Sequence, residues 1–302
     1  SKISGIAVDN VGRIYVLDIK EAQIKVFNKE GTYIKTLGKK GQGPGEMVSP
    51  FSICITRKDE IFVQDLNAHR ILLLSLEGAL IKTISTAELL LIGSVMDSRE
   101  NIIGLVGISG PERQIFELMK FDSNLNPLFN FCSASRPSSM ARPPYHPFNP
   151  EPAWTLTRGD AVIFGYTEDY ELKLFDSNGK LVRKITKDYE PVKITDDEIE
   201  DMRKKMPGPM ASELPKHHTA YQDFSADEEG HIFVRTWEKA DDRQRCYFDV
   251  FDADGRYITK AIVNGQPRVW KKGHLCTLEE DREGYPVVRR YKVFWKYPNG
   301  DN

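Results

Sequence analysis

The sequence predicts an all-β fold: a six-bladed β-propeller of four-stranded antiparallel blades that spans residues 1–302 as one domain. Three observations predict it. The first forty residues hold four short β-rich runs, Gly and Asp/Asn turns separate these runs, and the same pattern recurs along the chain. The recurrence has the roughly 40–50-residue step of propeller blades. Because one blade cannot bury both of its faces, consecutive blades are expected to stack around an axis.

The first unit shows the pattern most clearly. Its β-rich runs begin at Ile6 and continue at residues 14–17, 24–27 and 33–37. Turns at residues 9–12 and 28–31 end in glycine, as tight turns between strands often do. This spacing predicts a four-stranded meander.

Five further units follow, the last of them weaker than the others. The predicted second strands begin near Ile14, Ile61, Ile102, Val162, Ile232 and Leu275. A two-sheet β-sandwich is the competing fold, but five recurrences of one four-strand pattern argue against it.

Closure of the ring is the least regular part of the prediction. In propellers the last blade usually borrows a strand from the other terminus, but Ser1 stands immediately before the first inner strand. We therefore expect either a sixth blade of about three strands or a closing strand lost upstream of Ser1.

The repeat resembles a known family. IAVDNVGRIYVLD followed by IKVFNKEG resembles the NHL repeat, and residues 38–46 look like its Gly-rich connection between blades. The resemblance implies a fold used by scaffolds, RNA binders, sensors and a few metal-dependent lyases or lactonases. It is nearest to bacterial six-bladed propellers of unassigned role, which are often exported or lipid-anchored. An extracytoplasmic location (periplasmic, secreted or lipid-anchored) is expected on that basis alone. The matched residues are structural and imply no site.

Composition narrows the class of protein. A hydrophobic fraction of 40% and a charged fraction of 28% describe a soluble globular chain. The net charge of −2 argues against a general nucleic-acid binder, and no apolar run reaches the roughly 20 residues of a membrane span. The 4 cysteines form no CxxC pair, so a zinc motif has no support. We expect a monomer without a cofactor.

Strand alternation places the irregular segments on one face. Links between strands two and three share a face with links between blades, whereas short Asp/Asn/Gly turns occupy the other face. Two insertions, residues 133–152 and 186–221, belong to the irregular face. That face is therefore the predicted functional face.

The second insertion is expected to contain a short helix. Thr195 and Glu198 have the spacing of a capping box, and Ile194 with Ile199 could form a hydrophobic staple. The predicted helix covers residues 196–206 and ends at Pro207. It could act as a lid over a site or serve as decoration.

Aromatic and arginine side chains in these loops suit recognition of an acidic or sugar-like ligand, although exposed loops are also polar for no functional reason. The candidate ligand contacts are Arg70, Arg113, Tyr145, His146, Tyr170, His218, Trp237 and Arg245.

The favoured function is a binding module without catalytic residues, whose partner is a small molecule, glycan or protein. The alternative is a metal-dependent hydrolase or lyase with one divalent ion at the axial mouth, held by Glu, Asp, Asn or His from different blades. An RNA-binding domain is a third hypothesis, and it requires a continuous Lys/Arg surface.

Overall fold

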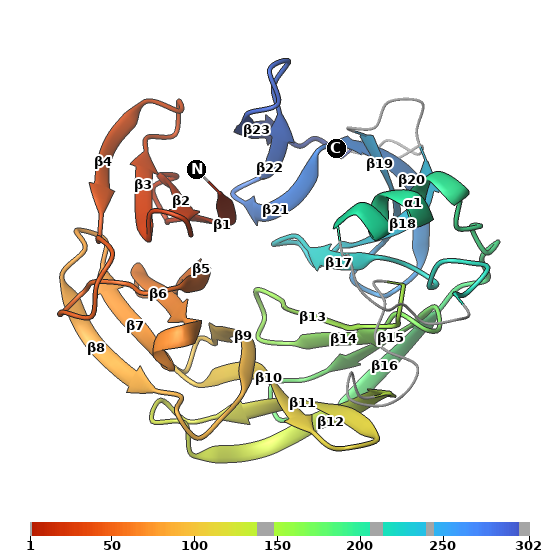
Figure 1. The fold of residues 1–302 in the computed structure, drawn as a ribbon, viewed down its shortest axis with the longest axis horizontal. Helices are drawn as coiled ribbons and strands as arrows, with labels where there is room; N and C mark the ends of the chain where they lie inside the picture. Colours follow the sequence, from red (N-terminus) through yellow and green to blue (C-terminus); the bar gives the residue numbers. More distant parts are fainter. Residues whose placement is uncertain (1, 138–147, 206–213, 240–244, 296–302) are drawn as a thin grey trace.

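Six β-sheets form a ring around a central axis (Figure 1). The structure is a computed structural model that describes residues 2–137, 148–205, 214–239 and 245–295. Five sheets have four antiparallel strands and the sixth has three. This arrangement confirms the predicted six-bladed propeller, including its three-stranded last blade.

Blades 1 to 3 occupy the first half of the chain. Blade 1 consists of β1 (Ile3–Val8), β2 (Ile14–Asp18), β3 (Gln23–Phe27) and β4 (Tyr33–Leu37). Blade 2 consists of β5 (Pro50–Ile55), β6 (Glu60–Asp65), β7 (Arg70–Ser75) and β8 (Leu80–Ser85), with the short 3-10 helix η1 (Leu66–Ala68) between β6 and β7. Blade 3 consists of β9 (Leu91–Met96), β10 (Ile102–Ser109), β11 (Arg113–Phe121) and β12 (Pro127–Pro137).

Blades 4 to 6 complete the ring. Blade 4 consists of β13 (Pro152–Leu156), β14 (Val162–Tyr166), β15 (Glu171–Phe175) and β16 (Leu181–Thr186). The helix α1 (Asp196–Lys205) follows it. Blade 5 consists of β17 (Asp223–Ala226), β18 (Ile232–Lys239), β19 (Arg245–Phe251) and β20 (Tyr257–Asn264). Blade 6 consists of β21 (Gln266–Lys271), β22 (His274–Glu280) and β23 (Pro286–Lys292).

The core lies between neighbouring blades. Tyr15 and Leu17 of blade 1 are fully buried in one cluster with Ile61 and Leu72 of blade 2. Such interblade clusters form because each sheet has apolar residues on both faces. Burying one large apolar side chain contributes about 1.5–3 kcal/mol, so the stacking of blades stabilises the ring.

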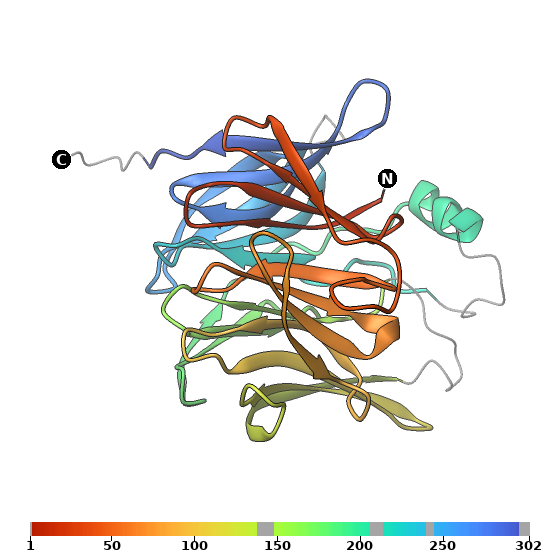
Figure 2. The same cartoon turned by 90° about the vertical axis from the view of Figure 1, so that its left-hand side faces the viewer.

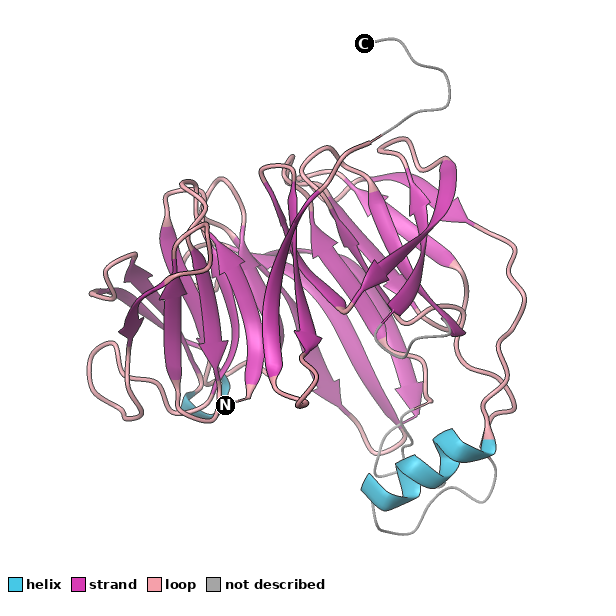
Figure 3. Cartoon of the chain, turned by 90° about the horizontal axis from the view of Figure 1, so that it is seen from above, coloured by secondary structure: helices cyan, strands magenta, loops and turns pink. Residues whose placement is uncertain are grey.

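The two helices of the described chain lie on one side of the ring. Helices η1 and α1 lie on the same side of the ring in Figure 3. Seen from another side, α1 projects beyond the stacked strands (Figure 2). We call this side, which carries the strand two-to-three links and the connections between blades, the insertion face.

The helix begins as its capping box predicts. The backbone N–H and the hydroxyl of Thr195 both donate to Glu198 Oε2, at 2.8 and 2.9 Å. Met202 is buried and Ile199 half-buried, so this side of α1 packs against the protein. The predicted last turn and stop, residues 206–208, lie outside the described residues.

The first insertion is shorter than expected. Residues 133–137 continue β12 and pair with residues 113–117 of β11. The first five residues of the predicted insertion are therefore part of a strand, because β11 is long enough to extend the pairing of β12.

Candidate functional site

Three hollows adjoin on the insertion face, between blades 4 and 5 and beside α1. Their volumes are about 320, 470 and 490 Å³. Thr219 borders the first and second hollows, and Trp237 borders the first and third. We call the three hollows together the Trp237 site.

Two backbone contacts fix the segment that passes through this site. After α1 the chain returns to the ring, where the His218 N–H donates to Val192 O at 2.9 Å. The Ala220 N–H then donates to Thr167 O of blade 4 at 2.8 Å. These bonds hold the segment against Val192 and blade 4, and the Gln222 N–H, which donates to Arg235 O at 2.8 Å, ties it to β18, the strand of Trp237.

His218 and Trp237 form the centre of the site. Their rings stack with centroids 4.0 Å apart and an interplanar angle of 10°. Trp237 Nε1–H donates to Thr219 Oγ1 at 3.1 Å, and Phe148 meets His218 edge-on at 5.7 Å. The His218 side chain is 1% exposed, so this cluster is a rigid wall of the site.

His218 is a buried titratable group without full hydrogen bonding. Its Nε2 lies 3.3 Å from Glu198 Oε1, but the approach lacks hydrogen-bond geometry. Its Nδ1 has no hydrogen-bond partner in the described part of the chain. Burial lowers the pKa of His218, while the Glu198 carboxylate opposes this shift. The ring is therefore held largely neutral.

Glu198 joins α1 to blade 5. Burial favours its neutral form, but hydrogen bonds from Thr195 and Lys239 outweigh burial and lower the pKa of Glu198 to about 2. Lys239 Nζ lies 3.2 Å from Glu198 Oε1. The carboxylate is thus ionised at neutral pH and attaches the helix to the end of β18.

The third hollow has a basic wall and an acidic wall. Arg235 and Arg245 line it from β18 and β19, while Asp197 and Asp201 line it from α1. The Nε atoms of both arginines are buried and lack hydrogen-bond partners among the described residues. An anionic ligand group could accept these hydrogen bonds, and charge-assisted bonds to arginine are strong ones.

The first hollow is built around a buried carboxylate. Asp249 accepts a 2.8 Å hydrogen bond from Tyr170 Oη at Oδ2. Lys187 Nζ lies 3.2 Å from the same oxygen, and Lys260 Nζ lies 3.9 Å from Oδ1. Two ammonium groups therefore border this hollow around one buried carboxylate.

The innermost strand of blade 5 adds a carboxylate near the axis. Asp223 keeps 59% of its side chain exposed, yet burial raises its pKa. Arg235 Nη1 lies 3.7 Å away, and Arg268 also acts electrostatically on Asp223. Two guanidinium groups beside one carboxylate disfavour a divalent cation there.

Four of the residues singled out in the sequence border the Trp237 site: Tyr170, His218, Trp237 and Arg245. Tyr145 and His146 lie outside the described residues. Tyr170 contributes indirectly, because its hydroxyl binds Asp249 and its ring is buried.

The structure places Arg70 and Arg113 away from the site. Arg70 Nη2 lies 3.0 Å from Asp65 Oδ2 and donates to Glu46 O at 2.9 Å, which ties blade 2 to its preceding loop. Arg113 donates to the Ser135 hydroxyl and carbonyl on the neighbouring strand. Both arginines are therefore engaged by residues of their own blade or of the loop that precedes it.

Sequence reasoning missed several contributors to the site. Asp249 carried a usable signal, since it interrupts the apolar run of β19. Lys187 and Lys260 are far apart in sequence and meet only through the packing of blades 4 and 5. Arg235 and Glu198 could not be assigned to the site from the sequence, because the sequence does not show where α1 lies relative to blade 5.

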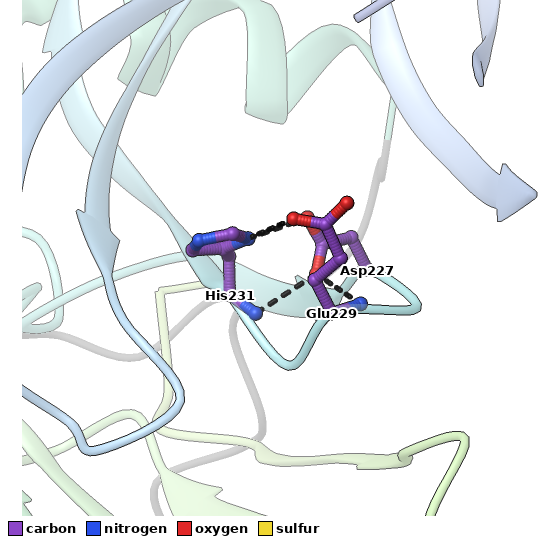
Figure 4. Close-up of side chains that lie close together, drawn as sticks. All are labelled: Asp227, Glu229 and His231. Carbon is purple, nitrogen blue, oxygen red and sulfur yellow. Dashed lines mark hydrogen bonds and ion pairs between the residues drawn. The ribbon is translucent and has the colours of Figure 1, made fainter. Parts of the chain in front are cut away.

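A second cluster, on the opposite face, has metal-ligand residue types. Asp227, Glu229 and His231 offer ligand atoms within 4.8 Å of one another, the one such group within the described ranges (Figure 4). Asp227 Oδ2 contacts His231 Nδ1 at 2.8 Å, and Asp227 Oδ1 accepts backbone N–H groups from both other residues.

The same turn recurs in other blades with Arg or Asn at the position of His231. In blade 1, Asp9 Oδ1 accepts the Arg13 N–H at 2.8 Å and its Oδ2 accepts Arg13 Nε–H. In blade 3, Asp97 contacts Asn101 in the same way. The Asp227–His231 contact is therefore explained as a turn cap.

The sequence profile of DUF5128, described as a 6-bladed beta-propeller, matches residues 1–157. The chain belongs to this family. No curated protein matches its sequence.

Solved structures share the fold at low sequence identity. A DUF4221 family member from Bacteroides vulgatus is 12% identical with a TM-score of 0.57, covering 96% of this chain and 93% of that one. A putative exported protein from Bacteroides fragilis is 13% identical, TM-score 0.54, covering 93% and 82%. A gluconolactonase from Xanthomonas campestris is 11% identical, TM-score 0.50, covering 93% and 80%. At these identities the similarity shows the fold alone.

No helix among the described residues is both long and apolar enough to cross a membrane.

Proposed function

We propose that this propeller is a binding module whose Trp237 site takes a small, acidic, sugar-like ligand. The observation that supports this most is the meeting of three hollows at one aromatic wall, with unpartnered arginine N–H groups in the third. Aromatic walls suit the apolar faces of a sugar ring, and guanidinium groups suit its carboxylate. A uronic acid combines both features.

Recognition rather than catalysis accounts for the arrangement of charges. The His218 ring is buried against Trp237, and the Tyr170 hydroxyl is engaged by Asp249. These groups hold the wall in place instead of presenting a free nucleophile or base to the hollows. In the third hollow, the Nε–H groups of Arg235 and Arg245 lack partners among the described residues, which suits binding of an anion.

The metal-dependent hydrolase or lyase stays an alternative hypothesis for the axial mouth. The described carboxylate on the innermost strand of blade 5, Asp223, is flanked by Arg235 and Arg268. This charge pattern does not favour the alternative. The similarity to the gluconolactonase concerns the fold alone and identifies no metal-ligating residue in this chain.

Calorimetric titration with glucuronate tests the proposal. Wild-type protein should bind glucuronate more tightly than glucose, which lacks the carboxylate, or acetate, which lacks the sugar ring. Arg245→Ala and Trp237→Ala should each weaken binding about ten-fold, the loss expected for one charge-assisted hydrogen bond or stacking contact. Arg113→Ala is the matched control and should bind normally. Equal binding by all variants would refute the assignment.

We further propose that the blades are NHL-like and that the protein acts outside the cytoplasm as a monomer. The turn-strand-turn pattern of blade 1 supports the repeat assignment. Fractionation of the native cells with an antibody, and sedimentation of the purified chain, test the location and the oligomeric state. A cytoplasmic pool or a stable dimer would contradict these proposals.

A further inference from the structure

The Trp237 site is larger than the single uronic acid that the proposed function assigns to it. Its first hollow measures about 320 Å³ and its third about 490 Å³. Pockets for drug-sized ligands usually measure roughly 300–1,000 Å³, so each hollow has room for a whole sugar unit. One monosaccharide therefore fills at most one of these two hollows.

The first and third hollows share one wall. Thr236, Trp237 and Glu238, at the C-terminal end of β18, border both of them. Residues of the link that follows β16 complete the first hollow, and residues of α1 complete the third. A ligand of two linked units can therefore occupy both hollows, with its linkage beside the half-buried Trp237.

The third hollow offers hydrogen-bond donors to an anion. The Nε atoms of Arg235 and Arg245 lack partners among the described residues, and Lys239 adds an ammonium group to the same lining. The carboxylate of the ligand belongs on this side of Trp237, because guanidinium groups form strong charge-assisted hydrogen bonds with carboxylates.

The cations of the first hollow are already paired. Lys260 Nζ forms an ion pair with Glu238, and Lys187 Nζ lies 3.2 Å from Asp249 Oδ2. The described charged residues that line this hollow are Lys187, Lys260, Asp188, Glu190, Glu238 and Asp249. A second carboxylate or a phosphate would meet an excess of negative charge there, and a ligand amine would have to displace one of the lysines. The first hollow therefore suits an uncharged group.

Paired charges of this kind suit hydroxyl groups, since a hydroxyl both donates and accepts a hydrogen bond. Asp249 has a place for such a group. Its side chain is 2% exposed, and its Oδ1 accepts no hydrogen bond from a described residue, with Lys260 Nζ 3.9 Å away. One hydroxyl oxygen about 2.8 Å from each of these two atoms would accept from Lys260 and donate to Asp249.

Aromatic rings from two segments border the first hollow. Tyr189, in the link after β16, is 37% exposed, and its ring contacts the buried ring of Tyr170 with 5.9 Å between centroids. Tyr170 is held by its hydrogen bond to Asp249, and Trp237 by its stack on His218. Rings fixed in this way offer flat apolar surface to the C–H face of a sugar.

We propose that the Trp237 site binds an acidic disaccharide, with a uronic acid in the third hollow linked to a neutral hexose in the first. The carboxylate binds Arg235 and Arg245. The hydroxyl groups of the hexose bind between Lys260 and Asp249, and its ring packs on Tyr189. This inference rests on the proposed function, to which it adds the second, uncharged unit and the residues that select it.

Calorimetric titration of the whole protein with glucuronate and with glucuronosyl-glucose tests the proposal. The disaccharide should bind about ten-fold more tightly, the gain expected from one hydrogen bond to a charged group and one stacking contact. Glucuronosyl-glucuronate, whose second unit carries another carboxylate, should bind no more tightly than glucuronate. Equal affinities for glucuronate and glucuronosyl-glucose would overturn the proposal. Tighter binding of the diacid, or of glucuronosyl-glucosamine, than of glucuronosyl-glucose would overturn it as well.

Two variants locate the hexose. Tyr189→Ala and Lys260→Met should each lower the ratio of the two affinities from about ten to about two, because each removes one contact of the hexose. Arg245→Ala should weaken both ligands and preserve the ratio. Tyr285→Ala, at an exposed tyrosine between β22 and β23, is the matched control and should change neither affinity. A ratio that stays near ten in both hexose variants would refute the placement in the first hollow.

The titration with glucuronate separates this inference from the proposed function. If glucuronate binds and loses affinity in Arg245→Ala, but glucuronosyl-glucose binds no more tightly, then the second unit is wrong and the proposed function stands. If neither ligand binds, both are wrong.

Discussion

The imidazole of His218 lies parallel to the indole of Trp237, with 4.0 Å between ring centroids and 10° between planes. The stack connects the segment that follows α1 to the C-terminal end of β18. Aromatic pairs of this kind contribute about 0.5–1.5 kcal/mol beyond their burial. A side chain from the longest interblade connection thus becomes part of the wall of the proposed ligand site.

Acid should destabilise the protein through His218. Burial lowers its pKa below the ordinary value of 6.5, so the unfolded chain takes up a proton before the folded one does. Stability from this group is complete above about pH 6.5 and is lost as pH falls through the lower folded value. Glu198 opposes this loss and Lys239 adds to it.

Urea unfolding at pH 7.5 and pH 5.0 measures this effect. Wild-type protein should lose more free energy of unfolding on acidification than His218→Phe, which keeps the stack but cannot titrate. Parallel losses in the two proteins would mean that His218 is not the group responsible.

Removing the Tyr170 hydroxyl should destabilise the boundary between blades 4 and 5. Tyr170→Phe keeps the buried ring but removes the 2.8 Å hydrogen bond that the Tyr170 hydroxyl donates to Asp249. A hydrogen bond to a charged group contributes about 1.5–3 kcal/mol, and thermal unfolding should register a loss of that size. Tyr189→Phe, in a neighbouring exposed ring, is the control and should change stability little. A loss below about 0.5 kcal/mol for Tyr170→Phe would show that the lysines alone satisfy Asp249.

Arg70 should matter for stability and not for ligand binding. Arg70→Ala leaves the buried Asp65 carboxylate with its Val48 and Ser49 N–H bonds but without its guanidinium partner, and loss of a hydrogen bond to a charged group costs about 1.5–3 kcal/mol. Arg113→Ala, whose partners are exposed, should cost less than about 1 kcal/mol. Chemical denaturation distinguishes the two. A stable Arg70→Ala protein that has lost glucuronate binding would return Arg70 to the list of ligand contacts.

Chelation should leave the melting temperature unchanged. The Asp227–His231 cap is held by its own hydrogen bonds, like the Asp9 and Asp97 turns of other blades. Thermal-shift scans with and without EDTA, together with elemental analysis, measure this. A stoichiometric metal and a lower melting temperature in EDTA would favour the metal-dependent alternative.

The blade pattern was readable from sequence because its causes are local. Strand-forming runs and Asp/Asn/Gly turns depend on near neighbours, so the second strands beginning at Ile14 and Ile232 were placed correctly. The capping box at Thr195 likewise acts within one turn, and α1 begins where it predicts.

The site was readable only in part because it depends on contacts between distant segments. Trp237 and His218 were identifiable as aromatic and polar residues in links, but their stacking needs the return path after α1. Arg70 looked like a free loop cation in the sequence, whereas its partner Asp65 faces it across a tight turn. The first insertion was overestimated because nothing in its first residues marks the end of β12.

The most direct test of the ligand proposal follows the indole N–H signals of the four tryptophans by NMR while glucuronate is added. Trp237 Nε1–H donates to Thr219 within the site, whereas Trp270 Nε1–H donates to Ser225 elsewhere in blade 5. Trp237→Phe assigns the signal. We predict a saturable shift of the Trp237 signal with the other three unmoved. A titration in which the Trp237 signal stays fixed while glucuronate binds, or in which glucuronate does not bind at all, would contradict the assignment.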